Sequence, residues 1–159
     1  QEPHPKRLKR FLQKKESYQD LIGLRQCIEF GTLQVIMDQG LDPEDAENLR
    51  QIAVSIEREL DEPNPDPKLI CRTDIAFHDA IAKATRNDLI VTVNEMLSKL
   101  TYGSRIRTIE QCIREHDRKY LVDIHFEILK ILEERDTDAI AHTLKRSYSY
   151  WANLQMEEE

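Results

Sequence analysis

The sequence predicts an all-α protein built as an antiparallel bundle of about six helices. Apolar residues recur every three or four positions along most of the 159-residue chain, which is the spacing of one helix face. Prolines and capping residues separate these periodic segments, and no segment alternates apolar and polar residues as a strand does. Only four glycines and 6% aromatic residues fit the same class. The length suits one domain with a core rather than two.

The amino-terminal residues differ in charge from the rest of the chain. Residues 1–15 contain six lysines and arginines against Glu2 alone, so with −7 for the whole chain the remainder carries −12. An acidic body of this kind repels phosphate backbones. We predict that residues 1–16 form a basic linker or tail and that residues 17–159 form the helical domain. Contact of the basic segment with a nucleic acid or a membrane surface is the alternative.

Two helices are expected in the first part of the domain. The first runs from about Tyr18 to Gln39 and stops at Gly40. Its apolar stripe comprises Leu21, Leu24, Ile28, Val35 and Ile36. The second begins after a capping Asp42 with Pro43 in its first turn. Its apolar positions are Leu49, Ile52, Ile56 and Leu60.

A proline-rich loop separates these helices from the next pair. The segment EPNPDP, residues 62–67, is expected to be non-helical because each proline disfavours helix in the residue before it. A third helix follows from about Leu69 to Arg86. Asn87 is the expected cap of a longer fourth helix, which reaches about Cys112 and which Gly103 could bend.

Two more helices complete the predicted bundle. The fifth carries Leu121, Ile128, Leu129 and Leu132, and the sixth begins at the cap Asp136 and runs through Leu144 toward Trp151. No apolar run approaches the roughly 20 residues that span a bilayer, and the amino end lacks the order of a secretory signal. A cytoplasmic location is therefore expected. The three widely spaced cysteines are predicted to be small buried residues rather than disulfide partners or zinc ligands.

Polar side chains interrupt the apolar faces of two predicted helices. Asp74 and His78 lie one turn apart beside Ile70, Phe77 and Ile81, and His125 has leucines and isoleucines at its helical neighbour positions. A buried carboxylate without a partner is costly, so something must compensate it. Two imidazoles and a carboxylate facing one interior could hold zinc, nickel or manganese. The alternative is a locally paired aspartate and a hydrogen-bonded core histidine.

Three blocks of sequence resemble a known family. They are DIAFHDAIAKATRN (residues 74–87), HFEILKILEERD (residues 125–136) and LRQCIE (residues 24–29). Together they are similar to the C-terminal effector-binding (FCD) domain of FadR-like GntR-family bacterial transcription regulators. The resemblance extends from about Tyr18 onward and implies a helical bundle with a central cavity. The resemblance also implies that a divalent metal in this cavity binds a small carboxylate.

The resemblance places three metal ligands and departs from the family at a fourth. Asp74, His78 and His125 match the family's aspartate and first two histidines. The family's last histidine corresponds to Ser147, and His142 lies five residues earlier, about 140° around the helix. Water or effector could complete a three-ligand site, with Ser147 acting directly or through water. A weaker site, or a pocket that has abandoned metal, are the alternatives. Zinc is expected first, with nickel or manganese possible.

Three further residues are candidates for contacting the ligand. Arg25 borders Leu21 and Ile28 on the first helix and could clamp a carboxylate, as the resemblance suggests. A surface position or pairing with Glu29 is the alternative. Asn87 and Arg107 are weaker candidates. Tyr148, Tyr150 and Trp151 are expected to serve core packing or a dimer contact.

These observations predict a sensor rather than an enzyme. The expected function is ligand sensing that controls an N-terminal winged helix-turn-helix, a DNA-binding domain absent from this chain, in a homodimeric regulator. The enzyme alternative is a metal-dependent HD-type phosphohydrolase, based on His78-Asp79 with Asp123 as a distant ligand. That site needs an earlier helical histidine, and only His4 lies upstream. A metal-free effector-binding domain is the second alternative.

Overall fold

The computed structural model describes residues 17–148, which form six helices and no strand. Five of the helices follow one another as α2 (Ser17–Gln39), α3 (Pro43–Asp61), α4 (Pro67–Ala84), α5 (Asp88–Arg114) and α6 (Arg118–Glu134). The sixth, α7 (Thr137–Ser147), is the shortest. The predicted all-α class and helix count are confirmed. Tyr150 and Trp151, for which packing was expected, lie outside the described residues.

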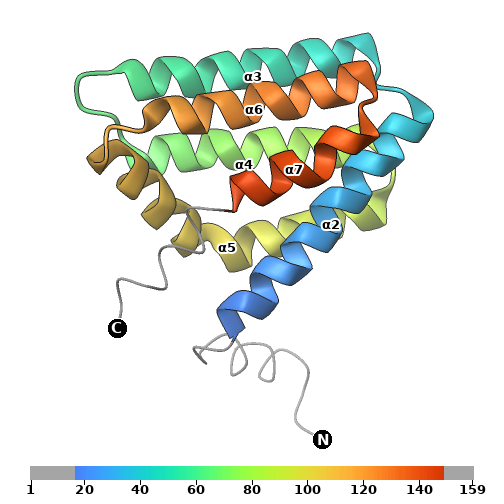
Figure 1. Ribbon diagram of the computed structural model, residues 1–159, viewed down its shortest axis with the longest axis horizontal. Coiled ribbons are helices and arrows are strands. Elements are labelled where there is room, and N and C mark those ends of the chain that lie inside the picture. The colour runs from blue at the N-terminus through green and yellow to red at the C-terminus, as the bar shows by residue number, and fades with distance from the viewer. Residues whose placement is uncertain (1–16, 149–159) are drawn as a thin grey trace, which may run out of the picture.

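The helices pack as an antiparallel bundle around one core (Figure 1). Helix α4 packs against both α3 and α5, α6 lies along α3, and α2 crosses α7. Short connections of a few residues force successive helices to reverse direction. The largest fully buried apolar side chains are Phe77, Ile36, Leu49, Ile56, Leu60, Ile70, Leu129, Leu132 and Ile140.

Capping residues start the helices largely where the sequence predicts. The side chains of Asp42, Asn87 and Asp136 each accept a backbone hydrogen bond in the first turn of α3, α5 and α7. The loop prediction for residues 62–67 is wrong at its end, because Asp66 caps α4 and Pro67 is its first residue. Proline is compatible with that position, where its missing N–H would have had no helical partner.

Helix α2 differs from its predicted amphipathic pattern. Leu21 and Ile36 are buried, but Leu24 and Val35 of the expected stripe are 43% and 36% exposed. Apolar residues therefore lie on the outer as well as the inner side of α2. The prediction for the cysteines is also wrong at one position, because Cys71 and Cys112 are buried while Cys27 of α2 is exposed. Among the described helices, none has the length and apolar composition of a bilayer crossing.

Candidate functional site

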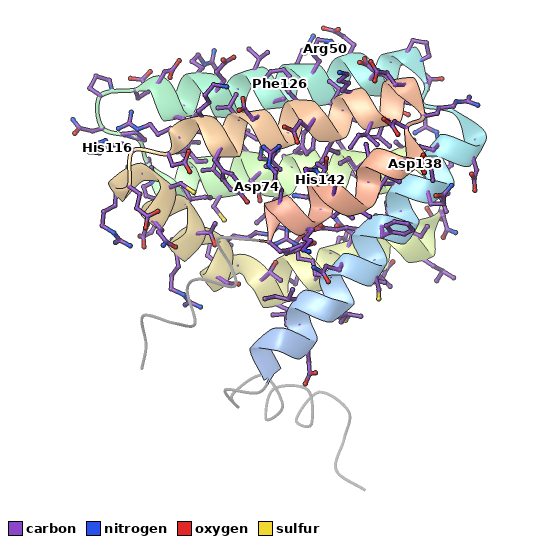
Figure 2. All side chains as sticks on the ribbon, viewed as in Figure 1. Arg50, Asp74, His116, Phe126, Asp138 and His142 are labelled. Carbon is purple, nitrogen blue, oxygen red and sulfur yellow. The ribbon has the colours of Figure 1, made fainter. Side chains whose placement is uncertain are left out.

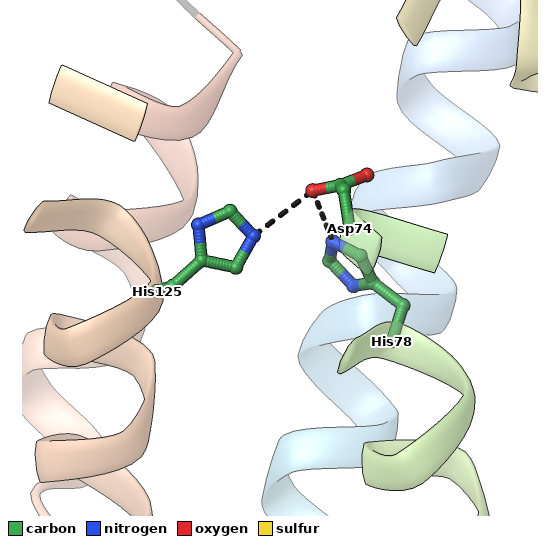
Figure 3. A group of neighbouring side chains, drawn as sticks. All are labelled: Asp74, His78 and His125. Atoms are coloured by element: carbon green, nitrogen blue, oxygen red, sulfur yellow. Dashed lines mark hydrogen bonds and ion pairs between the residues drawn. The ribbon is translucent and has the colours of Figure 1, made fainter. Parts of the chain in front are cut away.

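Asp74, His78 and His125 meet between α4 and α6 (Figure 3). Asp74 and His78 are one turn apart on α4, and His125 reaches toward them from α6. One ligand atom from each residue lies within 4.8 Å of the other two. Their side chains are 14%, 11% and 4% exposed. Helix α3 packs against both α4 and α6, and the bundle thus brings together three residues from two segments of the chain.

Both imidazoles present the same nitrogen to one carboxylate oxygen. His125 Nδ1 lies 2.6 Å from the carbonyl oxygen of Leu121, and since a carbonyl only accepts, this nitrogen carries the hydrogen. His125 Nε2 then lies 2.9 Å from Asp74 Oδ1, and His78 Nε2 lies 3.7 Å from the same oxygen. In a neutral His125, Nε2 is an acceptor facing a second acceptor. This arrangement requires a cation, either a proton or a metal ion.

Arg105 holds the other oxygen of Asp74. Its Nη1 donates to Asp74 Oδ2, and its Nε donates to Thr101 Oγ1 at 3.0 Å. Burial alone would raise the pKa of Asp74, but the charge of Arg105, followed by the contact with His125 Nε2, holds it well below its usual value. Burial, followed by the charge of Arg105, lowers the pKa of His78 to about 3. Asp74 is therefore a carboxylate and His78 a neutral imidazole near pH 7.

A second charged group adjoins the first. Arg25 Nε donates to Glu29 Oε1 at 2.5 Å, and the Tyr148 hydroxyl donates to Glu29 Oε2. The Arg25 guanidinium also lies 5.3 Å from the centre of the Tyr148 ring. Burial would raise the pKa of Glu29, yet the charge of Arg25 lowers it. These contacts join α2 to the end of α7, and Glu29 also faces His78 Nδ1 at 3.8 Å.

These groups line a small cavity of about 50 Å³, here called the charged chamber. It is bounded by Arg25, Glu29, Asp74, His78, Arg105, Thr108, Ile109, Leu121, Ile124, His125, Ile128 and Ser147. Thr108 is 5% exposed, and its hydroxyl makes no hydrogen bond within residues 17–148. A buried hydroxyl without a partner is costly, so Thr108 is a candidate for contacting a bound molecule.

The predicted ligand residues occupy different places. Arg25 is buried in the lining of the charged chamber and pairs with Glu29, as the alternative for it expects, while its role as a carboxylate clamp stays a prediction. Ser147 lines the same chamber, and its hydroxyl donates to Leu144 O at 2.7 Å. His142 is exposed on α7 (Figure 2). Asn87 is exposed and caps α5, away from the chamber lining.

Arg105, rather than Arg107, is the arginine of α5 that faces the chamber. Arg107 is exposed, whereas Arg105 is 4% exposed. The sequence contained a signal for this, because Leu97, Thr101, Arg105, Thr108 and Cys112 follow at helical spacing on one face. The prediction counted seven residues from Leu100 instead and chose Arg107, which lies on the opposite side of α5 from Arg105. Thr108 was also missed, and Glu29 was expected only as a possible partner of Arg25.

The donor set fits a divalent metal. Metal bonds to imidazole nitrogen and carboxylate oxygen are about 2.0–2.2 Å long, so two ligands of one ion lie roughly 3–4 Å apart, as the nitrogens do from Asp74 Oδ1. Ligand histidines usually donate their second nitrogen, and ligand carboxylates are usually held by a further donor. His125 and Asp74 have such partners in Leu121 and Arg105.

The residues of the enzyme alternative point elsewhere. Asp79 accepts a hydrogen bond from Asn94 Nδ2 at 2.6 Å, and Asp123 pairs with Lys119 on the outside of α6. Neither residue lines the charged chamber. The geometry therefore gives no support to an HD-type arrangement of His78, Asp79 and Asp123.

Comparison with known proteins identifies the family. A search of curated proteins and a search of solved structures returned no match. The sequence model of the FCD domain family matches residues 20–149. This range includes all six helices except the first three residues of α2. The match covers most of the 159 residues and the whole charged chamber. The chain therefore belongs to the FCD family, the C-terminal effector-binding domains of GntR-family regulators.

Proposed function

We propose that this domain senses a small carboxylate metabolite through a divalent metal held by Asp74, His78 and His125. The observation that supports the proposal is the shared orientation of the two histidine Nε2 atoms toward Asp74 Oδ1. The other ligand atoms are already engaged, since His125 Nδ1 donates to Leu121 O and Asp74 Oδ2 accepts from Arg105. When bound, such a cation supplies an open coordination position that a carboxylate or hydroxyl oxygen can occupy. Zinc suits the donors first, and nickel or manganese are alternatives.

The other residues of the chamber orient and neutralise the anion. The Arg25 guanidinium can bind the carboxylate of the ligand, which then competes with the Glu29 carboxylate for this guanidinium. Ser147, in the place of the family's histidine, contributes its oxygen directly or through a water. Arg105 keeps Asp74 ionised and fixed, so that its second oxygen faces the imidazoles.

Ligand binding is coupled to the rest of the regulator through α2. Glu29 of α2 accepts hydrogen bonds from both Arg25 and Tyr148. An anion that binds Arg25 in place of Glu29 would therefore alter the hydrogen bonds that join α2 to the end of α7. Helix α2 follows residues 1–16, the proposed linker. A shift of α2 would alter the arrangement of N-terminal winged helix-turn-helix domains in a cytoplasmic homodimer. The ligand acts only through unequal affinity for the two arrangements.

Metal analysis of protein purified without chelator tests the metal site. We expect about one equivalent of metal in the parent chain, because three donors converge on one position, and almost none in Asp74→Ala or His125→Ala. His142→Ala is the matched control, since it removes an exposed imidazole from α7 and should leave the metal content unchanged. Equal and negligible metal in all four proteins would favour the metal-free alternative.

A further inference from the structure

His78 lies between two carboxylates, one near each ring nitrogen. Its Nε2 is 3.7 Å from Asp74 Oδ1, and its Nδ1, on the side of the ring away from Asp74, is 3.8 Å from Glu29 Oε1 (Figure 3). Both distances are too long for a direct hydrogen bond, and polar groups so far apart are commonly bridged by a water. A neutral imidazole carries one hydrogen, and Nε2 keeps the lone pair that binds a metal only when this hydrogen is on Nδ1.

A second, smaller cavity lies on the Nδ1 side of His78. It measures about 20 Å³, and a water needs at least about 10–15 Å³, so there is room for one water molecule. Four polar residues, Glu29, Thr32, His78 and Asn94, line it together with aliphatic side chains. Glu29, next to Nδ1, lines both this cavity and the charged chamber, whereas Asp74, next to Nε2, lines the charged chamber alone. The space that a bridging water would need is therefore present beside Nδ1.

The other polar groups of this cavity offer acceptors to a water. The Thr32 hydroxyl donates to a backbone carbonyl of its own helix at 2.6 Å, so lone pairs remain on its oxygen. Asn94 Nδ2 donates to Asp79 Oδ1 at 2.6 Å, which leaves the Asn94 amide oxygen to accept. Glu29 is a carboxylate and only accepts. A water that gives its two hydrogens to such acceptors needs a donor for its own oxygen, and His78 Nδ1 is placed to be that donor.

The opposite placement of the hydrogen would waste this arrangement. With the hydrogen on Nε2, Nδ1 would become a fourth acceptor at the cavity, 3.8 Å from an oxygen of the Glu29 carboxylate. One water has two hydrogens, so two of the four acceptors would lack a hydrogen from it, and buried polar groups without partners are costly. The hydrogen-bonding capacity of the cavity therefore favours the ring with its hydrogen on Nδ1.

We propose that Glu29 is a positioning residue of the metal site, which holds the hydrogen of His78 on Nδ1 through one buried water shared with Asn94. His125 is oriented in the same way by a direct contact, because its Nδ1 donates to Leu121 O. Histidines that bind metals usually donate their second nitrogen to a carboxylate, a carbonyl or a water. The inference rests on the proposed function, to which it adds the group that orients the second imidazole ligand.

The position of the hydrogen can be measured by NMR on the metal-free chain. Long-range proton–nitrogen correlation spectra distinguish the two neutral forms of an imidazole, and His78→Gln identifies the signals of His78. We expect the hydrogen on Nδ1 in the parent chain at pH 7. Asn94→Leu fills the space of the water without changing the charge, and Glu29→Gln removes the carboxylate, so both should shift the hydrogen toward Nε2.

The parent spectrum and a control make this test decisive. Glu59→Gln makes the same charge change at a half-buried position of α3 outside both cavities and should leave the His78 signals unchanged. A hydrogen on Nε2 in the parent chain overturns the proposal without any variant, so the test stands even if Glu29→Gln does not fold. A hydrogen that stays on Nδ1 in both Asn94→Leu and Glu29→Gln overturns it as well.

Zinc affinity, measured by titration against a competing chelator, gives the second reading. Loss of the partner of a ligand histidine typically weakens metal binding by roughly 10- to 100-fold, which is the expected effect of Asn94→Leu and of Glu29→Gln. Glu59→Gln should bind zinc as the parent chain does. If Glu29→Gln weakens binding and Asn94→Leu does not, Glu29 acts through its charge alone and the proposal is wrong.

The two readings separate this inference from the proposed function. If the parent chain binds no zinc, while its His78 hydrogen is on Nδ1 and shifts in both variants, the metal site fails and the assignment of the hydrogen bond stands. If the parent chain binds zinc and both variants bind it equally well, only the positioning role of Glu29 fails.

Discussion

Arg105 and Asp74 form the ion pair on which the polar cluster depends. Arg105 is 4% exposed and comes from α5, whereas Asp74 belongs to α4, so the pair links two helices at the centre of the bundle. Thr101, one turn before Arg105, is fully buried and accepts from its Nε. Removing one partner of a buried pair leaves the other charge without compensation. This makes Arg105 a structural as well as a chemical requirement of the site.

Replacing Arg105 should destabilise the metal-free protein strongly. With Arg105→Met, Asp74 stays buried with no guanidinium beside it, and we expect the free energy of unfolding at pH 7 to fall by about 3 kcal/mol. Urea denaturation after removal of metal by chelator measures this loss. Arg107→Met is the control, because the same substitution two residues away changes an exposed side chain and should have little effect.

A double variant shows whether the charge of Asp74 causes the loss. Asp74→Asn combined with Arg105→Met removes both charges, so most of the lost stability should return. If Arg105→Met is as stable as the parent chain, or if the double variant is less stable than Arg105→Met, the ion pair does not carry the energy assigned to it.

Single residues show what could be predicted for the site. Asp74, His78 and His125 were recognisable because polar side chains stood at apolar helix positions, and the structure brings them together. Arg105 was not identified, because the helical count began at Leu100, on another face of α5 from Leu97 and Cys112. That Arg105 pairs with Asp74 becomes evident only when α4 and α5 are packed together.

At the scale of elements, turns and caps define where the helices end. Gly40 stops α2 with φ +89°, and its N–H donates to Ile36 O at 2.7 Å. Only glycine adopts such a backbone without steric cost. A Cβ at this position would also meet the Arg135 side chain, which lies over the turn from the end of α6. The path from α2 into α3 therefore depends on this residue.

Alanine at Gly40 should lower stability, while alanine at Gly103 should raise it. Gly40→Ala forces an L-residue into the positive-φ region and should cost about 1–2 kcal/mol in the free energy of unfolding. Gly103 lies within α5, where an added Cβ meets only Arg107 Nη1 at 3.7 Å. Gly103→Ala should therefore stabilise by about 0.5–1 kcal/mol through helix propensity. Thermal and urea unfolding of both variants checks the two signs, and equal signs would contradict the assignment.

Element boundaries were predictable where the cap chemistry was local. Three helix starts were predicted from capping residues, and the structure confirms them. The caps are Asp42, which Pro43 follows, Asn87 and Asp136. The start of α4 was misplaced because the proline rule was applied to Pro67 as if it lay inside a helix. The orientation of α2 could not be derived, because apolar residues surround it and no single face is marked for the core.

At the scale of the whole molecule, the outer side of α2 exposes apolar residues, and we propose that a second copy of the chain covers them. Leu24, Cys27, Gly31 and Val35 follow at spacings of three and four residues, and all four are exposed. Phe30 beside them is 40% exposed and lines a groove between α2 and α7. Apolar side chains on the solvent side of a helix are unfavourably exposed to water. Self-association would bury them and remove this unfavourable contribution.

Charge on this face should dissociate the proposed homodimer. Combining Leu24→Glu with Phe30→Glu places two carboxylates on each copy, so a two-fold contact would bring four negative charges together and lose its apolar area. We expect the parent chain to sediment as a dimer and this variant as a monomer in analytical ultracentrifugation. Val54→Glu, at a 48% exposed apolar position of α3, is the control and should remain dimeric. A parent chain that stays monomeric at tens of micromolar, or a variant that stays dimeric, would show that α2 does not form the interface. Because α2 also carries Arg25 and Glu29, the proposed dimer contact would lie on the same helix as two residues of the charged chamber, as the proposed coupling through α2 requires.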